Sequence, residues 1–149
     1  MIKAVFDSNL LISAFLTRNS GGISTELLRF VIDGAIELYL SLAIADEVAE
    51  TLTENERARA RYRYTEQQVV QYRADLLLLA TVVDNPPAMP GAVPWDPDDD
   101  KIIACAVAAG VGYLVTRDHD LLSLDRYGAI EIISPETFLR IVRQEPRVL

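Results

Sequence analysis

Four acidic side chains stand where the sheet of an α/β protein would bring them together. Asp7 and Asp118 each follow an apolar, strand-like run, Glu47 lies on a helical segment, and Asp100 lies in the first turns of another. Because chemistry in parallel sheets occurs outside the carboxyl ends of the strands, we expect all four to converge on one edge. Carboxylates held close together repel one another unless hard cations bridge them, which predicts bound Mg²⁺ or Mn²⁺.

Zinc is not expected at this site. The chain has a single cysteine, Cys105, within an apolar run, and a single histidine, His119, which fits an exposed loop. Zinc sites in proteins are usually built from several cysteine and histidine ligands, whereas oxygen ligands alone favour magnesium or manganese.

Each acid also has an explanation without chemistry. Asp96, Asp98 and Asp99 suit the start of a helix, where acidic residues cap the helix and meet the positive end of its dipole. Asp100 stands deeper, directly before a buried helical face, so capping explains it less well, although which acid of the triplet is the ligand stays open. Glu47 alone could be a solvated helix charge, and Asp7 could start a turn. These explanations do not account for all four residues sharing one edge.

The elements that must position the acids follow from the periodicity of the apolar residues. Strands are expected at residues 2–6, 36–41, 113–116 and 130–133. Helices are expected at residues 9–16, 24–34, 42–52, 65–80, 97–110 and from 134 onward, with a helical arm or turn over 53–64. Alternating strands and helices predict an α/β fold: a three-layer α/β/α sandwich around a central, mainly parallel sheet of four to five strands.

Length and composition bound the remaining possibilities. At 149 residues, half of them hydrophobic, residues 1–149 are expected to form a single domain. The longest uninterrupted apolar run, residues 76–83, is far shorter than a membrane span, and no leader precedes the first strand, so we expect a cytoplasmic protein without membrane contact. The net charge of −8 argues against a uniformly basic nucleic-acid binder but is compatible with a carboxylate site.

Four segments of the chain resemble the motifs of the PIN domain. They are VFDSNLLISA, LSLAIADEVAETL, DDDKIIACA and LVTRDHDLL, in that order along the chain. The PIN domain is a nuclease family that includes VapC-like toxins of bacterial type II toxin–antitoxin pairs. The resemblance implies an Mg²⁺- or Mn²⁺-dependent endoribonuclease that hydrolyses phosphodiester bonds in RNA. It further implies a cognate antitoxin protein and a homodimer.

The resemblance also implies a role for each matching residue. The implied catalytic residues are Asp7, Glu47, Asp100 and Asp118, and the implied metal ligands are Asp7, Asp100, Asp118 and Asp120. Side chains that would align these ligands by hydrogen bonds are Ser8, Asn9 and Thr116. Ser8 stands where the family more often has threonine, and either hydroxyl can hold a neighbouring ligand. Whether one or two metal ions take part is left open.

Phosphate contacts would have to come from basic residues elsewhere in the chain. Twelve of the fourteen basic residues are arginine, which is suited to forked recognition of phosphate. Four of them, Arg57, Arg59, Arg61 and Arg63, alternate along one segment. This segment is either a solvated arm or a surface that contacts RNA or an acidic partner.

Other families with acids at sheet edges fit less well. A phosphoacceptor receiver domain needs a second acid beside the first, but Ser8 follows Asp7, and Arg117 stands nearest to the place of its late lysine. A haloacid-dehalogenase phosphatase needs D-x-D at the first strand, where Asn9 replaces the second acid. The stronger alternative is a catalytically silent PIN-like module that binds RNA or protein.

Overall fold

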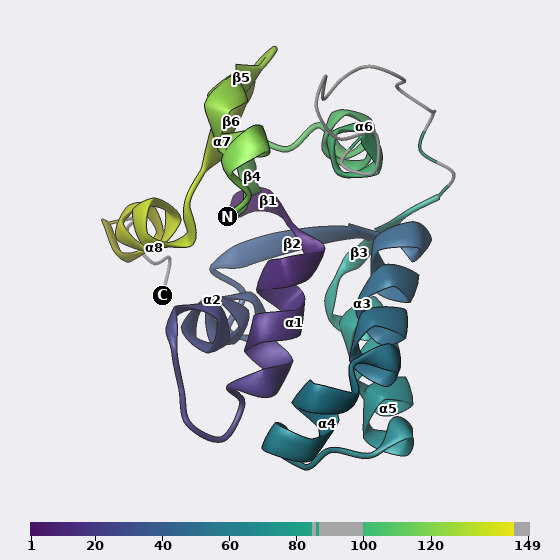
Figure 1. Ribbon diagram of the computed structural model, residues 1–149. Coiled ribbons are helices and arrows are strands. Elements are labelled where there is room, and N and C mark those ends of the chain that lie inside the picture. Colours follow the sequence, from purple (N-terminus) through teal and green to yellow (C-terminus); the bar gives the residue numbers. More distant parts are fainter. Residues whose placement is uncertain (85, 87–99, 145–149) are drawn as a thin grey trace.

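Strands and helices alternate along most of the chain in the computed structural model, which describes residues 1–84, 86 and 100–144. The strands are β1 (Ile2–Phe6), β2 (Ile36–Ser41), β3 (Thr81–Val83), β4 (Tyr113–Val115), β5 (Arg126–Tyr127) and β6 (Ile130–Ile133). The helices are α1 (Ser8–Leu16), α2 (Ile23–Ile32), α3 (Leu42–Glu54), α4 (Glu56–Tyr62), α5 (Glu66–Leu79), α6 (Asp100–Ala109), α7 (His119–Leu124) and α8 (Pro135–Gln144). The predicted α/β class is confirmed (Figure 1).

The strands form one sheet in the order β3-β2-β1-β4-β6-β5, in which only the β5–β6 pair is antiparallel. The prediction of four to five strands was wrong, because the described residues contain six. Both strands that sequence analysis missed are short edge strands, too short for a periodic pattern: β3 has three residues and β5 has two. β3 continues the apolar run that ends helix α5, and β5 turns back onto β6 at Gly128, whose φ of +59° suits glycine.

Helices cover both faces of this sheet. Figure 1 shows α6 on one side and α1, α2 and α3 on the other. Helix α6 contacts β1, β2, β3 and β4, and its residues Ile102, Ile103, Ala104, Cys105 and Ala106 are buried against them. The apolar stretch predicts a helix buried between the sheet and another layer, and the five consecutive residues 102–106 are buried, whereas Val107 further along the helix is 41% exposed. The predicted start of this helix at residue 97 lies outside the described residues.

The helices on the opposite face are joined to one another by side-chain contacts and caps. Thr65 followed three residues later by Gln68 predicts a capping box, and the structure confirms it at the start of α5. The hydroxyl of Tyr72 on α5 donates a hydrogen bond to the carbonyl of Leu11 on α1 at 2.7 Å. On the other half of the sheet, the ring of Phe138 in α8 packs edge-to-face on Phe6 of β1, with ring centroids 6.0 Å apart. No helix of the described part of the chain is long and apolar enough to cross a membrane.

The strand order reverses at β1, and this reversal selects one edge of the sheet. Strands β2 and β3 lie on one side of β1. After α6 the chain crosses to the other side of β1, where β4 and β6 lie. In open α/β sheets, ligands bind outside the carboxyl ends of the strands at such a switch point. Phe6 pairs with Val115 at the ends of β1 and β4, so the residues that follow, Asp7 and Thr116, lie beside each other there.

Candidate active site at the β1–β4 switch point

Asp7 is a buried carboxylate at the end of β1. The residue is only 3% exposed. Its backbone N–H donates a hydrogen bond to the carbonyl oxygen of Val115 at 3.0 Å. The hydroxyl of Ser8 donates to Asp7 Oδ1 over a longer 3.4 Å. Strand pairing therefore fixes the backbone of Asp7, and the carboxylate is held in the interior at the end of the sheet.

Thr116 is the residue that links two of the predicted site acids. It is fully buried, and its hydroxyl donates to Asp7 Oδ2 at 2.7 Å while accepting the backbone N–H of Asp118 at 2.9 Å. Its own N–H donates to the carbonyl of Ile133 on β6 at 3.0 Å. A single hydroxyl thus sets both the orientation of the Asp7 carboxylate and the path of the chain into Asp118.

Asp118 caps helix α7. Its Oδ1 accepts the backbone N–H of Asp120 at 2.9 Å, as expected of an N-cap acid. Asp120 lies in the first turn of α7 and is partly buried. The capping role of Asp118 is therefore real, but it does not exclude a second role for the same carboxylate, because an ionised carboxylate accepts several hydrogen bonds or a cation.

Glu47 reaches the same region from helix α3. The helix begins at the end of β2, where the hydroxyl of buried Ser41 accepts the N–H of Ile44 at 3.2 Å. Glu47 is one turn further along α3 and pairs with Lys101 of α6, with Nζ and Oε1 3.1 Å apart. Helix α3 thus turns an acid toward α6 across the end of β2.

Burial and neighbouring charge act together on Asp7. Its pKa is raised above the ordinary value of 3.8, chiefly because burial penalises the charged form, and the negative charges of Asp118 and Glu47 raise it further. The hydrogen bonds from Thr116 and from the Ser8 backbone oppose this rise. Asp7, Glu47 and Asp118 therefore form one electrostatically coupled group of acids.

The donor set of this group suits a hard divalent cation, because all of its donors are carboxylate oxygens and their mutual repulsion would be relieved by positive charge. In the described ranges 1–84, 86 and 100–144, however, no three acidic, histidine or cysteine side chains are arranged closely enough to hold a metal ion. Two of the acids have protein partners instead, Lys101 for Glu47 and the start of α7 for Asp118. The chemistry of the site thus fits a divalent ion, and binding one would require these carboxylates to move closer.

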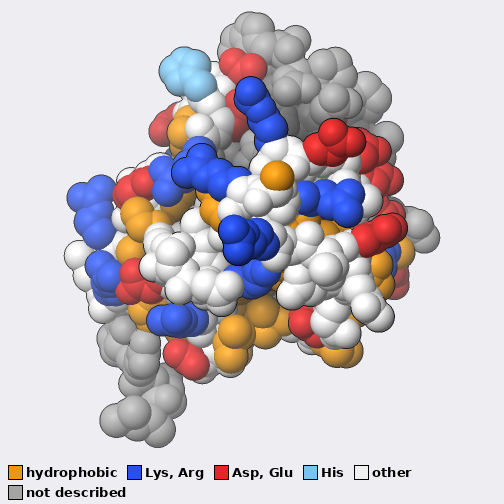
Figure 2. Space-filling model, turned by 60° about the horizontal axis from the view of Figure 1, so that its bottom comes forward, with side chains coloured by type: hydrophobic (Ala, Val, Ile, Leu, Met, Phe, Trp, Pro, Cys, Tyr) orange, Lys and Arg blue, Asp and Glu red, His pale blue; other side chains and the backbone are white. Residues whose placement is uncertain are grey.

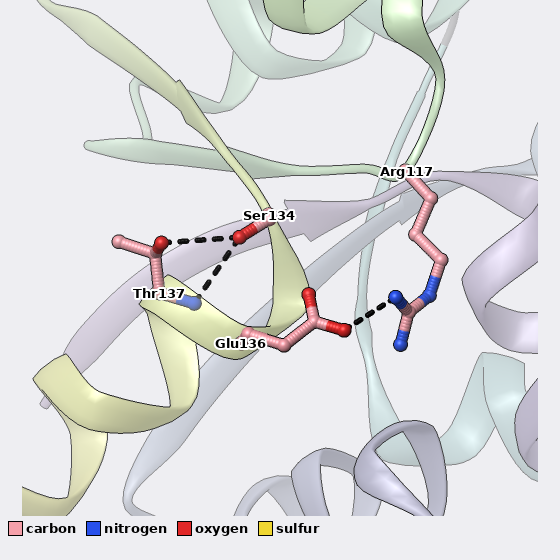
Figure 3. Close-up of polar contacts among 4 residues, drawn as sticks. All are labelled: Arg117, Ser134, Glu136 and Thr137. Atoms are coloured by element: carbon pink, nitrogen blue, oxygen red, sulfur yellow. Dashed lines mark hydrogen bonds and ion pairs between the residues drawn. The ribbon is translucent and has the colours of Figure 1, made fainter.

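Arg117 lies between Thr116 and Asp118 in sequence but does not neutralise the acids. Its guanidinium is paired with Glu136 in the first turn of α8, as Figure 3 shows. Hydrogen bonding within the first turn of α8, and the pairing with Arg117, hold the pKa of Glu136 below its usual range. The same turn is capped by Ser134, whose hydroxyl accepts the N–H of Thr137 at 3.2 Å (Figure 3). Arg117 thus anchors the loop after β4 to α8.

The remaining predicted residues lie in different surroundings. Asp100 is the first residue of α6, adjacent to Lys101, and is partly buried, whereas Asp96, Asp98 and Asp99 lie outside the described residues. Asn9 is exposed on the first turn of α1. The roles predicted for Asn9, Asp100 and Asp120 stay predictions. His119 is exposed, as expected, but it is the first residue of α7 and not part of a loop.

The arginine segment lies at the far end of α3 from this edge. The arginines Arg57, Arg59, Arg61 and Arg63 are all exposed, on α4 and its C-cap. Helix α3 has 13 residues, so α4 begins roughly 20 Å from the sheet edge at which α3 starts. The arginines therefore form a surface separate from the acids.

Comparison with known protein families agrees with this geometry. Residues 3–120 match the PIN domain, and the chain belongs to this family. Members of the family are typically nucleases that bind divalent metal. A comparison with curated protein sequences gave no significant match.

Sequence reasoning missed Lys101. The available signal was its position, because a lysine in the first turn of a helix faces the unfavourable, positive end of the helix dipole. A cation placed there, directly after an acid, indicates that a tertiary partner holds it.

We expect Thr116→Val to destabilise the protein in metal-free buffer. The substitution keeps the shape of the side chain but removes the hydroxyl that serves Asp7 and Asp118. Loss of a partner for a buried polar group costs about 1–3 kcal/mol, and each kcal/mol lowers Tm by roughly 2–4 °C at this size. Thermal unfolding followed by circular dichroism measures the effect. Thr116→Ser, which keeps the hydroxyl, should melt much closer to the wild type, and equal melting of the valine and serine variants would contradict the assigned bridge.

We expect Asp7→Asn to raise Tm in metal-free buffer at neutral pH. The pKa of Asp7 is raised on folding, so its contribution to stability is fully present below 3.8 and is lost as pH rises through its folded pKa. The advantage of the asparagine variant should therefore grow from acidic to neutral pH and be smallest below 3.8. Thermal melts of both proteins across this range test the sign. A variant that is less stable than the wild type at neutral pH would show that the ionised carboxylate supports the apo fold.

Proposed function

We propose that this chain is an Mg²⁺- or Mn²⁺-dependent endoribonuclease that acts as the toxin of a toxin–antitoxin pair. The observation that carries the proposal is the Thr116 hydroxyl, which joins Asp7 to Asp118 at the switch point of a PIN domain. A fold gains little stability from burying an acid among other acids, so this arrangement is better explained by chemistry. Glu47 supplies a third carboxylate within electrostatic reach of Asp7.

In the proposed mechanism each acid has a role. Asp7, Asp100 and Asp118 would hold a divalent ion, with Asp120 as a further ligand, and Glu47 would orient the attacking water and accept its proton. The water oxygen forms a bond to phosphorus in line with the sugar oxygen, whose bond to phosphorus breaks and which takes up a proton from solvent. A divalent ion in this site would lower the pKa of the attacking water and stabilise charge on the phosphate and the leaving oxygen.

RNA is favoured as the substrate because helix α4 presents exposed arginines at the end of α3 that is far from Asp7 and Asp118. Figure 2, which brings the bottom of Figure 1 forward, shows basic side chains across the middle and left of that face, with acidic side chains between them at the left and a larger group of acids at the upper right. Helix α4 contributes exposed arginines, and the guanidinium of Arg61 lies 5.4 Å from the ring centroid of Tyr62, which is 37% exposed. Arginine beside an exposed aromatic ring is a surface that suits a phosphate backbone with unpaired bases.

The partners and the organisation of the chain belong to the same proposal. A cognate antitoxin and a second copy of this chain would bind it, and residues 1–149 would act as one domain. The resemblance supports the toxin role, and a small reading frame directly adjacent in the genome would support it further.

The alternative function is a PIN-like module that binds RNA or protein without cutting. The observation that favours it is the ion pair between Glu47 and Lys101, which engages one of the acids that the reaction needs. Metal-dependent cleavage by the purified protein discriminates between the two functions.

We expect Asp7→Asn and Asp118→Asn each to abolish Mn²⁺-dependent cleavage of single-stranded RNA by the purified protein. Asparagine caps helices as well as aspartate does, so Asp118→Asn keeps the start of α7 while removing the charge. The matched control is Asp46→Asn, which lies next to Glu47 but pairs with Arg73 on the surface.

Cleavage is followed on a labelled oligonucleotide with and without chelator. If the two site variants and the control cut at the wild-type rate, the activity comes from elsewhere and the proposed site is wrong. If the wild type itself cuts nothing with either metal, the silent module becomes the better assignment.

A double variant of α4, Arg57→Gln with Arg61→Gln, should bind RNA more weakly and with a flatter salt dependence. Each lost phosphate contact lowers the slope of log K against log salt by about 0.7 for a single strand, so two contacts lower it by about 1.4. Arg59 is left in place because it donates to the carbonyl of Thr53 at 3.3 Å. Filter binding with Asp7→Asn as background, to prevent cleavage, measures the slope.

Arg140→Gln is the control for this experiment, since Arg140 is also exposed but lies on α8. If the α4 variant has the wild-type slope of log K against log salt, Arg57 and Arg61 do not contact RNA and belong to a solvated arm.

A further inference from the structure

Arg117 carries a positive charge at the edge of the sheet where the site acids lie. It follows Thr116 and precedes Asp118 in the chain, so its Cα is about 3.8 Å from the Cα of Asp118. The Thr116 hydroxyl faces Asp7, whereas the guanidinium of Arg117 faces Glu136 at the start of α8. The two neighbouring side chains therefore point to different sides of this edge. A strand of RNA that crosses the acids toward α8 would meet Arg117 next.

The guanidinium of Arg117 is held in place and still has donors that face solvent. One terminal nitrogen contacts a single carboxylate oxygen of Glu136, and Figure 3 shows the other nitrogens of the guanidinium directed away from that oxygen. The Arg117 side chain is 53% exposed, so these remaining N–H groups are accessible to a ligand. Glu136 is itself fixed, because it lies in the first turn of α8, which Ser134 caps. A guanidinium that is already oriented loses little freedom when it binds.

A second arginine–glutamate pair of the chain has the same chemistry and almost the same exposure. The arginine side chains of the Arg117–Glu136 and Arg126–Glu131 pairs are 53% and 56% exposed. Glu131 pairs with the first residue of β4, so Arg126 lies at the amino end of that strand, away from the site acids. Exposed ion pairs of this kind contribute little to stability. The two arginines therefore differ in position, and the position of Arg117 indicates a role in the site.

We propose that Arg117 binds the RNA phosphate next to the one that is cut, on the α8 side of the site acids. This proposal rests on the proposed nuclease function, because it names a further contact of the same substrate. Arginine presents its donors in a planar fork that matches two oxygens of a phosphate. Its charge also offsets the repulsion that the site acids exert on a polyanion. Arg117 supplies charge and hydrogen bonds only and takes no part in bond breaking.

The test measures how a single-stranded RNA oligonucleotide binds to Asp7→Asn in the presence of chelator, so that neither cleavage nor metal contributes. Adding Arg117→Gln to this parent should weaken binding roughly tenfold at low salt, because charge-assisted hydrogen bonds are lost. It should also lower the slope of log K against log salt by about 0.7, the value for one phosphate of a single strand. Arg117→Lys keeps the charge without the fork, so it should keep the slope and bind RNA more weakly than the parent.

Glu136→Gln separates phosphate binding from a purely structural role. It breaks the same ion pair as Arg117→Gln but leaves the guanidinium in place, and glutamine keeps the shape of the side chain. If Arg117 only anchored the loop after β4 to α8, the two variants would change RNA binding alike. We expect instead that Glu136→Gln keeps the slope of the parent and binds RNA at least as tightly. Arg126→Gln removes an equally exposed, paired arginine and should change neither quantity.

Three outcomes would overturn the role of Arg117: an unchanged salt slope in Arg117→Gln, equal weakening of RNA binding by Glu136→Gln, or an equal loss of slope in Arg126→Gln. Thermal melts of all variants show whether each is folded. Failure of the proposed function looks different, because a wild type that cuts no RNA with Mg²⁺ or Mn²⁺ shows it directly. In that case the slopes measured without metal still decide whether Arg117 binds phosphate.

Discussion

The hydrogen bond from Thr116 to Asp7 is the contact on which the site depends. It joins the residue that ends β1 to the residue that follows β4, across the point where the strand order reverses. The same hydroxyl accepts the N–H of Asp118, so it also sets the start of α7. A buried carboxylate needs such a donor, since a charge without a partner in the interior is strongly unfavourable. The sheet, the cap of α7 and the acid group are therefore coupled through one side chain.

Holding these acids together opposes the stability of the apo protein. Burial and the neighbouring charges of Asp118 and Glu47 all disfavour the ionised form of Asp7. Local conflicts of this kind concentrate at functional sites, where the rest of the fold compensates for them. Here the compensation comes from strands buried under α6 and from the aromatic contact between Phe6 and Phe138. The ion pair of Lys101 with Glu47 removes part of the repulsion locally.

The positions of the charged residues in this chain are more informative than their net charge. A net charge of −8 would suggest repulsion of nucleic acid, yet α4 presents exposed arginines about 20 Å from the sheet edge at which α3 begins. These arginines are therefore apart from Asp7 and Asp118, which lie at that edge. Net charge therefore says little about partners when basic and acidic residues occupy different surfaces.

The sequence by itself determined the order of the main elements and the edge of the sheet at which Asp7 and Thr116 lie. Apolar runs followed directly by Asp7 and Thr116 are local signals, and parallel strands bring their carboxyl ends to one edge whatever the details of packing. The Thr65–Gln68 capping box was readable for the same reason, because both partners lie within one turn. The short strands β3 and β5 were not readable, since two or three residues hold a strand only through pairing with a neighbour.

Only the tertiary structure decided which side chains of that edge interact. The Thr116 hydroxyl and the Asp7 carboxylate are 109 positions apart in sequence, and Lys101 meets Glu47 through the packing of α6 near α3. Likewise, Arg117 is adjacent to Asp118 in the sequence, but its guanidinium pairs with Glu136 of α8. A pattern along the chain records which groups are available at an edge, whereas the orientation of each group depends on contacts between distant segments. For this reason the acids could be named from the sequence, and the lysine among them could not.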